Sequence, residues 1–212
     1  MIDQNIRKDI VQYARRMYAD KLVSATSGNI SVRIPDRENA FAITPSSEDY
    51  VTMTEDRIVI MTFDGTILES ANDAKPSSEW RLHAEIYRAR KDVKAVVHTH
   101  SPYATACAVV RQKIPMILIE MKPWLGGEVL LSEYAPTGTL QLARNVARDL
   151  GDRNCCLMAN HGVVAVASNL DLAYVRATYV EDAARIYHLA KCMGTPYVIP
   201  ENVGGGRGNI DD

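Results

Sequence analysis

The chain has 212 residues, 47% of them apolar and 24% charged, which is typical of a folded soluble protein and excludes disorder for most of its length. Its 24 basic residues are balanced by 26 acidic ones, so no excess of positive charge attracts nucleic acid or an anionic membrane. No apolar run approaches the roughly 18 residues of a membrane-spanning helix, and we expect neither nucleic acid nor a membrane as a partner.

The first half of the chain is predicted to begin with a helix and to continue as a set of strands. Apolar residues at spacings of three and four, including Ile6, Ile10 and Met17, predict an amphipathic helix over residues 3–21. Asp64-Gly65 is a turn signal that joins two of the following strands into a hairpin. The predicted strands are residues 29–34, 40–44, 57–63 and 66–68.

Helices and strands alternate in the second half. Helix-start signals and apolar spacing predict helices over residues 75–90, 102–111, 138–150 and 170–193. Apolar and β-branched runs predict strands over residues 94–100, 116–120, 155–158 and 162–167. This order predicts an α/β fold in which helices cover a mainly antiparallel sheet. We expect one domain over residues 1–200 and a flexible, glycine-rich tail over residues 201–212.

The cysteines and the N-terminal segment indicate where the protein works. Four cysteines, of which Cys155 and Cys156 are adjacent, do not make a disulfide framework. The first ten residues mix both signs of charge where a secretory signal would be apolar. We therefore expect a reducing, cytoplasmic location.

Two histidines near the end of a predicted strand give the strongest chemical signal. His98 and His100 are two residues apart, and because side chains alternate along a strand, both imidazoles point to the same face. Imidazole nitrogens suit Zn²⁺ and its neighbours in the transition series, so the pair could begin a metal site. The alternative is a pair of surface histidines at a sheet edge.

His161 and Glu79 are the candidates to complete such a site. His161 occupies a corner between two apolar strands, where the alternative is a hydrogen-bonded turn residue. Three histidines leave the open fourth position of a catalytic zinc site, which Glu79 could fill or border. Glu79 also lies at a predicted helix start, where a carboxylate is a favourable capping residue. His83 and His188, inside predicted helices, are interpreted as structural.

Three short loops are rich in hydrogen-bond donors. They comprise residues 26–29, 44–47 and 77–78. Backbone N–H groups, hydroxyls and a helix N-terminus together can hold an anion without any lysine. Each loop alone is an ordinary turn or helix cap, and it is their occurrence beside a metal constellation that favours an anion site.

Five motifs in these segments occur in a recognisable order. They are Thr26-Ser27-Gly28-Asn29-Ile30-Ser31, Ile43-Thr44-Pro45-Ser46, Pro76-Ser77-Ser78-Glu79-Trp80, Val97-His98-Thr99-His100-Ser101 and Ala159-Asn160-His161-Gly162. In this order, and over about residues 5–195, the chain resembles the class II aldolase/adducin-head family. The resemblance is closest to the L-fuculose-1-phosphate aldolase branch and to related deoxyketose-1-phosphate aldolases.

The resemblance implies a three-layer α/β/α domain around a central, mainly antiparallel sheet, usually assembled as a homotetramer with its active site near a subunit interface. By motif, His98, His100 and His161 would bind Zn²⁺, or another divalent metal such as Mn²⁺ or Co²⁺. Glu79 would bind the metal in the empty enzyme and act as the catalytic acid/base when substrate arrives. The residues that would hold the substrate phosphate are Gly28, Asn29, Ser46, Ser47, Ser77 and Ser78.

The implied reaction is the reversible cleavage of a ketose, or deoxyketose, 1-phosphate to dihydroxyacetone phosphate and a small aldehyde through a metal-stabilised enediolate. The alternatives on the same metal site are a ketopentose-5-phosphate 4-epimerase and a related phosphosugar decarboxylase. A non-catalytic module like the adducin head is a third alternative, and the retained histidines and glutamate argue against it.

One position departs from the pattern of the fuculose-phosphate aldolase branch. Ile119 stands where that branch has a tyrosine that donates a proton to the aldehyde half of the substrate. Glu120 and Tyr134 are the candidates to replace it at the aldehyde end, and the alternative is an aldehyde that needs no strong proton donor. Residues 114–131 are also rich in apolar side chains, which predicts a face against another chain, with internal core as the alternative.

Overall fold

The computed structural model describes residues 2–71 and 73–200, in which eight strands form one sheet. The strand order is β4-β3-β2-β1-β5-β8-β7-β6, and every neighbouring pair is antiparallel except β6 with β7. The prediction of a mainly antiparallel sheet is therefore confirmed. The strands are β1 (Asn29–Arg33), β2 (Ala40–Ile43), β3 (Val59–Thr62), β4 (Ile67–Glu69), β5 (Ala95–Thr99), β6 (Leu130–Ser132), β7 (Cys155–Met158) and β8 (Gly162–Ala167).

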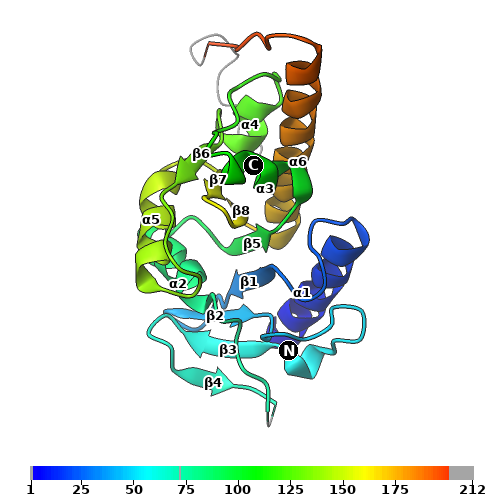
Figure 1. The fold of residues 1–212 in the computed structure, drawn as a ribbon. Coiled ribbons are helices and arrows are strands. Elements are labelled where there is room, and N and C mark those ends of the chain that lie inside the picture. Colours follow the sequence, from blue (N-terminus) through cyan, green and yellow to red (C-terminus); the bar gives the residue numbers. More distant parts are fainter. Residues whose placement is uncertain (1, 72, 201–212) are drawn as a thin grey trace.

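Helices cover both faces of the sheet and complete a three-layer α/β/α arrangement (Figure 1). Four helices share one apolar cluster on one face of the sheet, and two pack against each other over a second cluster on the opposite face. The first group is α1 (Ile2–Ala19), α3 (Pro102–Val109), α4 (Met121–Leu125) and α6 (Leu170–Met193). The second group is α2 (Trp80–Ala89) and α5 (Leu140–Leu150), and a short 3-10 helix, η1 (Glu55–Arg57), precedes β3.

The alternation of side chains along β5 determines on which face of the sheet the His98 side chain lies. Ala95 and Val97 belong to the cluster under α1 and α6, whereas Val96 belongs to the cluster under α2 and α5. Because the side-chain period of a strand is two, His98 lies on the Val96 face, toward α2. Asn29 of β1 is the direct antiparallel partner of His98, so the two side chains lie together under α2.

The segment before α4 differs from the sequence prediction. Its apolar run predicts a strand over residues 116–120, but the backbone there is irregular and leads into α4. The prediction is wrong because side chains such as Met116 join the core on the α6 face, and no strand pairs with residues 116–120 among the described residues. The nearest pairing is an isolated bridge between Ile114 and Val129. The sheet edge is formed instead by the three-residue strand β6, parallel to β7, which is too short to be predicted from its apolar pattern.

Most of the apolar stretch 114–131 packs inside the chain. Ile119 is exposed over 76% of its surface, and it is the one exposed large apolar residue of this stretch, all of which the structure describes. The buried members are Ile114, Met116, Met121, Leu125 and Val129. The internal-core alternative therefore accounts for most of this stretch, whereas a face against another chain stays a prediction for its exposed part.

Two further sequence expectations concern membrane spans and the C-terminal tail. Within residues 2–71 and 73–200, no helix is both long and apolar enough to cross a membrane. The tail predicted over residues 201–212 lies outside the described residues.

Candidate active site

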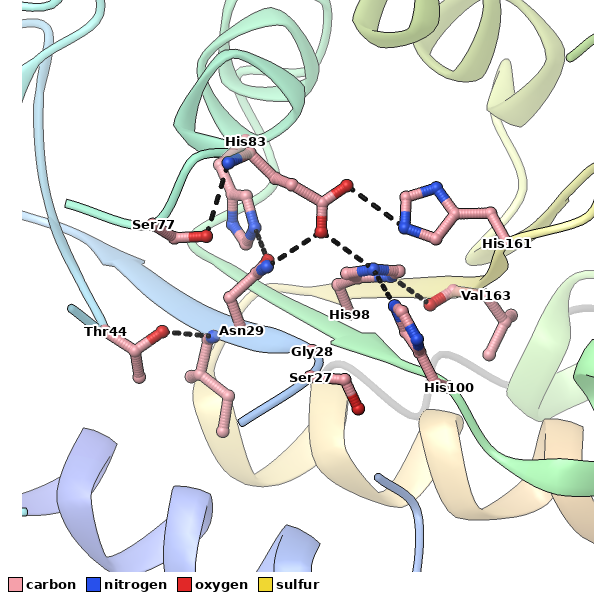
Figure 2. Close-up of polar contacts among 12 residues, drawn as sticks. Ser27, Gly28, Asn29, Thr44, Ser77, His83, His98, His100, His161 and Val163 are labelled. Atoms are coloured by element: carbon pink, nitrogen blue, oxygen red, sulfur yellow. Dashed lines mark hydrogen bonds and ion pairs between the residues drawn. The ribbon is translucent and has the colours of Figure 1, made fainter. Parts of the chain in front are cut away.

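The end of β5 holds two histidines in contact. His98 is fully buried, and its Nδ1 lies 3.0 Å from the carbonyl oxygen of Val163 in β8. Because a carbonyl oxygen can only accept, Nδ1 carries a hydrogen, so Nε2 is the nitrogen of His98 that could bind a metal. That Nε2 lies 3.0 Å from Nε2 of His100, which follows the strand (Figure 2).

A sharp corner between β7 and β8 brings in the third histidine. Asn160 has a left-handed backbone with φ of 54°, and the His161 N–H donates to the carbonyl of Met158. A Cβ on the next residue, Gly162, would lie 2.3 Å from the Thr99 carbonyl oxygen, so only glycine lets the two strand ends approach this closely. The three imidazole rings are consequently mutual neighbours, with centroids 4.9 to 5.0 Å apart.

Glu79 faces these histidines from the start of α2. It occupies the N-cap position, but its side chain makes no capping hydrogen bond. Its carboxylate oxygens lie 3.1 Å from Nε2 of His98 and 3.2 Å from Nε2 of His161. The backbone N–H of Glu79 is held instead by the hydroxyl of Ser77, 3.3 Å away. The carboxylate is therefore free of a capping role and is directed at the imidazoles.

The electrostatics of this cluster fit a divalent cation. Burial would raise the pKa of Glu79, but the charge of His98, together with His161, outweighs it and holds that pKa well below its usual range. Burial and the neighbouring charges of His98 and His161 lower the pKa of His100 to about 3. Among the described residues, Oε1 of Glu79 is buried without a hydrogen-bond partner. Ligand atoms of all four residues lie within 4.8 Å of one another, so three imidazoles and one carboxylate could share one metal ion.

A cavity of about 440 Å³ opens beside this cluster. Glu79, His100 and His161 line it, together with all six residues predicted to hold phosphate. Those six are Gly28, Asn29, Ser46, Ser47, Ser77 and Ser78. Tyr134 also lines the cavity, whereas Glu120 and Ile119 do not belong to the described residues that line it.

Backbone contacts hold the three donor-rich loops at the cavity. Gly28 has φ of 76°, and a Cβ there would lie 2.7 Å from the His98 carbonyl oxygen, so glycine lets its loop lie against β5. The other two loops are bonded to each other, because Ser46 N–H donates to the Lys75 carbonyl and Ser77 N–H donates to the Thr44 carbonyl. The structure thus brings together loops that are separate in the sequence.

Two buried polar residues have contacts that the sequence reasoning did not foresee. Asn29, predicted only as a phosphate ligand, donates from Nδ2 to Oε2 of Glu79 over 3.0 Å. His83, interpreted as structural, is fully buried and hydrogen-bonded to Oδ1 of Asn29. The signal that could have found it is its position one helical turn after Glu79, on the same face of α2.

Comparison with known proteins gives the family. A model of the Class II Aldolase and Adducin N-terminal domain matches residues 8–188, and the chain belongs to this family. It is 36% identical over 202 residues to the 5-deoxy-D-ribulose 1-phosphate aldolase of Bacillus thuringiensis, and the aligned residues cover 95% of this chain and 93% of that protein. It is 34% identical over 182 residues to the L-fuculose phosphate aldolase of Escherichia coli, covering 86% of this chain and 82% of the relative.

A solved structure agrees with the sequence relatives. The structure described as L-fuculose 1-phosphate aldolase matches with a TM-score of 0.89 and 36% sequence identity, over 93% of this chain and 92% of that one. These relatives are named as aldolases, which are lyases. The predicted family, its α/β fold and the expectation that the chain is an enzyme of the class II aldolase type are therefore confirmed.

We expect one divalent metal ion per chain, bound through His98, His100 and His161. Replacing His161 with alanine removes one of three imidazole ligands and should lower zinc affinity by more than about 100-fold, as measured by titration with a competing chelator and by elemental analysis. His188→Ala is the matched control, because His188 is exposed on α6 and its ring contacts Tyr103 rather than the cluster. Unchanged zinc affinity in His161→Ala would contradict the site.

Proposed function

We propose that the chain is a divalent-metal-dependent aldolase, with zinc as its metal, that reversibly cleaves a ketose or deoxyketose 1-phosphate into dihydroxyacetone phosphate and a small aldehyde. The observation that carries this proposal is one cavity in which Glu79, His100 and His161 meet the hydroxyl-rich loops. The names of two relatives, an aldolase of 5-deoxy-D-ribulose 1-phosphate and one of L-fuculose phosphate, support this substrate class.

The proton at C3 is the part of this reaction that Glu79 would handle. In the cleavage direction the C3–C4 bond breaks and its electron pair stays on C3. The C4 hydroxyl would pass its proton, by way of the Tyr134 hydroxyl, to the Glu79 carboxylate as it becomes the aldehyde carbonyl. A divalent cation held by His98, His100 and His161 supplies a Lewis acid for the negative charge on the C2 and C3 oxygens. The Glu79 carboxyl delivers a proton to C3, and in the synthetic direction the same carboxylate removes it.

The substrate phosphate would lie among the hydroxyl-rich loops. The described lining of the cavity contains no lysine or arginine, so hydroxyl and backbone N–H groups are the donors available to an anion. The hydroxyls of Ser46 and Ser47 lie 3.4 Å apart, and Ser78 is exposed beside Glu79. A phosphate held there would place the C2 and C3 oxygens of a 1-phosphate toward the histidines.

Tyr134 is the residue of this chain that we assign to the aldehyde end. It lines the cavity, the residue is 60% exposed, and the Arg111 guanidinium lies 5.8 Å from the ring centroid. A phenol can donate a proton to the carbonyl oxygen of an incoming aldehyde. Glu120 could serve only the cavity of a neighbouring chain, because it does not line its own.

We also propose a homotetramer in which a subunit boundary borders the cavity. Two exposed valines support this placement, because Val109 and Val110 lie immediately before Arg111, whose guanidinium contacts the ring of the cavity residue Tyr134. A cytoplasmic location is part of the same proposal. The four free thiols, of which Cys107, Cys155 and Cys156 are buried, are compatible with such a reducing compartment.

The reaction and the role of Glu79 can be tested together. The metal-loaded protein should form carbon–carbon bonds between dihydroxyacetone phosphate and one or more of lactaldehyde, acetaldehyde and glycolaldehyde. Glu79→Gln should keep the metal and lower this turnover by a factor of about 10² or more, because the amide cannot move the C3 proton. Glu85→Gln, on the same helix but paired with Arg88, is the control and should stay near the unaltered rate. Epimerisation without bond formation would favour the epimerase alternative instead.

The phosphate site predicts a selective loss in Ser46→Ala. Removing one hydrogen bond to a charged group should raise KM for the phosphorylated substrate by about 10- to 100-fold, since such a bond contributes about 1.5–3 kcal/mol. The zinc content should not change. Steady-state kinetics on a matched non-phosphorylated ketose provides the control, and an equal loss on both substrates would show that Ser46 has only a structural role.

The oligomer is testable by light scattering at working concentration. The unaltered protein should be a tetramer, and Val110→Glu should dissociate it and lower turnover more than about tenfold, because a buried, unpaired carboxylate is costly at an interface. Leu68→Glu is the control, since Leu68 is comparably exposed but lies on β4 at the far edge of the sheet. A fully active monomer would overturn the shared site.

A further inference from the structure

A chain of buried polar side chains runs from Glu79 away from the cavity, through the space between β1 and α2. Asn29 bonds to Glu79 through Nδ2 and to His83 Nε2 through Oδ1. His83 Nδ1 lies 2.6 Å from the Ser31 hydroxyl, which lies 2.7 Å from the Tyr87 hydroxyl. Asn29, Ser31, His83 and Tyr87 are each at most 3% exposed, so water does not compete for these bonds. Figure 2 shows the His83 ring bonded to the side chain of Asn29.

Each hydrogen bond in this series decides which atom of the next residue must donate. An ionised carboxylate only accepts, so the Asn29 amide must turn its NH₂ to Glu79 and its oxygen to His83. Nε2 of His83 must therefore carry a hydrogen, and Nδ1 accepts from Ser31. Ser31 in turn accepts from Tyr87, so all the donors point toward Glu79, an arrangement in which successive bonds strengthen one another.

The charge state of His83 agrees with this arrangement. Burial, reinforced by the charge of His98, lowers the pKa of His83 to about 3. The ring is consequently neutral at pH 7 and holds one hydrogen. A neutral ring suits the chain, because only one of its two nitrogens has to donate.

The opposite orientation of the Asn29 amide would disturb both halves of the cavity. A flipped amide would place its oxygen against Oε2 of Glu79, so that two acceptors face each other without a hydrogen between them. It would also exchange the NH₂ group for the amide oxygen at a residue that lines the cavity. The orientation of this one amide therefore affects both the carboxylate and the polarity of the cavity wall.

We propose that His83 is a positioning residue for the active site: its Nε2–H holds the Asn29 amide in the orientation that presents NH₂ to Glu79. The hydrogen bonds of His83 within the described residues go to Asn29 and Ser31, not to Glu79 or the three clustered histidines, and His83 does not line the cavity. Its effect on the orientation of the site is therefore transmitted through Asn29. The expected effect on kcat rests on the proposed function, whereas the expected tautomer of His83 and orientation of Asn29 do not.

The kinetic test is a double-mutant cycle on the zinc-loaded full chain. His83→Leu should lower kcat for aldol formation by about 10- to 100-fold with one zinc still bound per chain, as for loss of a residue that orients a ligand. In the Asn29→Ala background, the same substitution should change kcat by less than about threefold, because the amide it orients is gone. His83→Gln, whose amide can donate to the Asn29 oxygen, should recover kcat to within about fivefold of the unaltered protein.

Packing damage is separated from positioning by a matched variant. Ile86 lies one turn further along α2 and is fully buried in the apolar cluster between α2, α5 and the sheet. Ile86→Val should change kcat less than twofold in either background. If His83→Leu lowers kcat by the same factor with and without Asn29, the role of His83 is only structural and the proposal is wrong. Loss of kcat that follows loss of zinc would also overturn it.

A second measurement needs no activity and no replacement of His83 that could fail to fold. Histidine-selective ¹⁵N spectra of the zinc-loaded protein should show His83 as the neutral Nε2–H tautomer, with a shift of this signal in Asn29→Ala. A neutral Nδ1–H tautomer, or a signal indifferent to Asn29, would overturn the inference. If the unaltered protein forms no aldol product while the tautomer and its dependence on Asn29 are as expected, the proposed function fails and the positioning by His83 stands.

Discussion

Strand β5 pairs with β1 along one edge and with β8 along the other, and the registers of these two ladders set the position of most groups in the site. The first register places Asn29 opposite His98, and the second places the Val163 carbonyl within reach of the His98 ring. The chain then turns at Asn160 and returns His161 to the end of the same ladder. Backbone pairing, rather than long flexible side chains, therefore brings the imidazoles together, which is the rigid placement that a metal site requires.

Helix α2 supplies the opposite wall of this site, and its N-cap residue, Glu79, carries the carboxylate. A buried carboxylate among imidazoles costs desolvation energy that hydrogen bonds or opposite charge must offset. One oxygen of Glu79 receives Asn29 and faces His98, while the other, without a hydrogen-bond partner among the described residues, faces His161. The two oxygens therefore have different neighbours, because Oε2 is hydrogen-bonded to Asn29 whereas Oε1 faces an imidazole alone. Under the proposed function, Oε1 is the oxygen with no amide hydrogen bond to break when the carboxylate moves a proton.

The sequence predicts which residues lie together at the candidate site better than it predicts the boundaries of the elements. The two-residue spacing of His98 and His100 after an apolar strand predicts their common face, and the helix start predicts where Glu79 lies. The prediction of a strand over residues 116–120 is wrong, because a continuous apolar run fits an irregular core segment as well as it fits a strand. The role of His83 could not be read from the sequence either. Its partners Asn29 and Ser31 are more than fifty positions away in the sequence. They reach His83 because α2 packs over β1 in the folded chain.

The close approach at Gly162 also bears on how this sequence can change over time. Every other amino acid would add a Cβ at 2.3 Å from the Thr99 carbonyl oxygen, and that oxygen belongs to backbone that cannot move aside cheaply. A substitution at this position would push β8 away from β5 and carry His161 with it, so folding and ligand geometry would suffer in one step. A replacement here therefore carries a steric cost unless β5 or β8 shifts at the same time. We expect glycine to persist at this position, even though it contributes no functional group of its own.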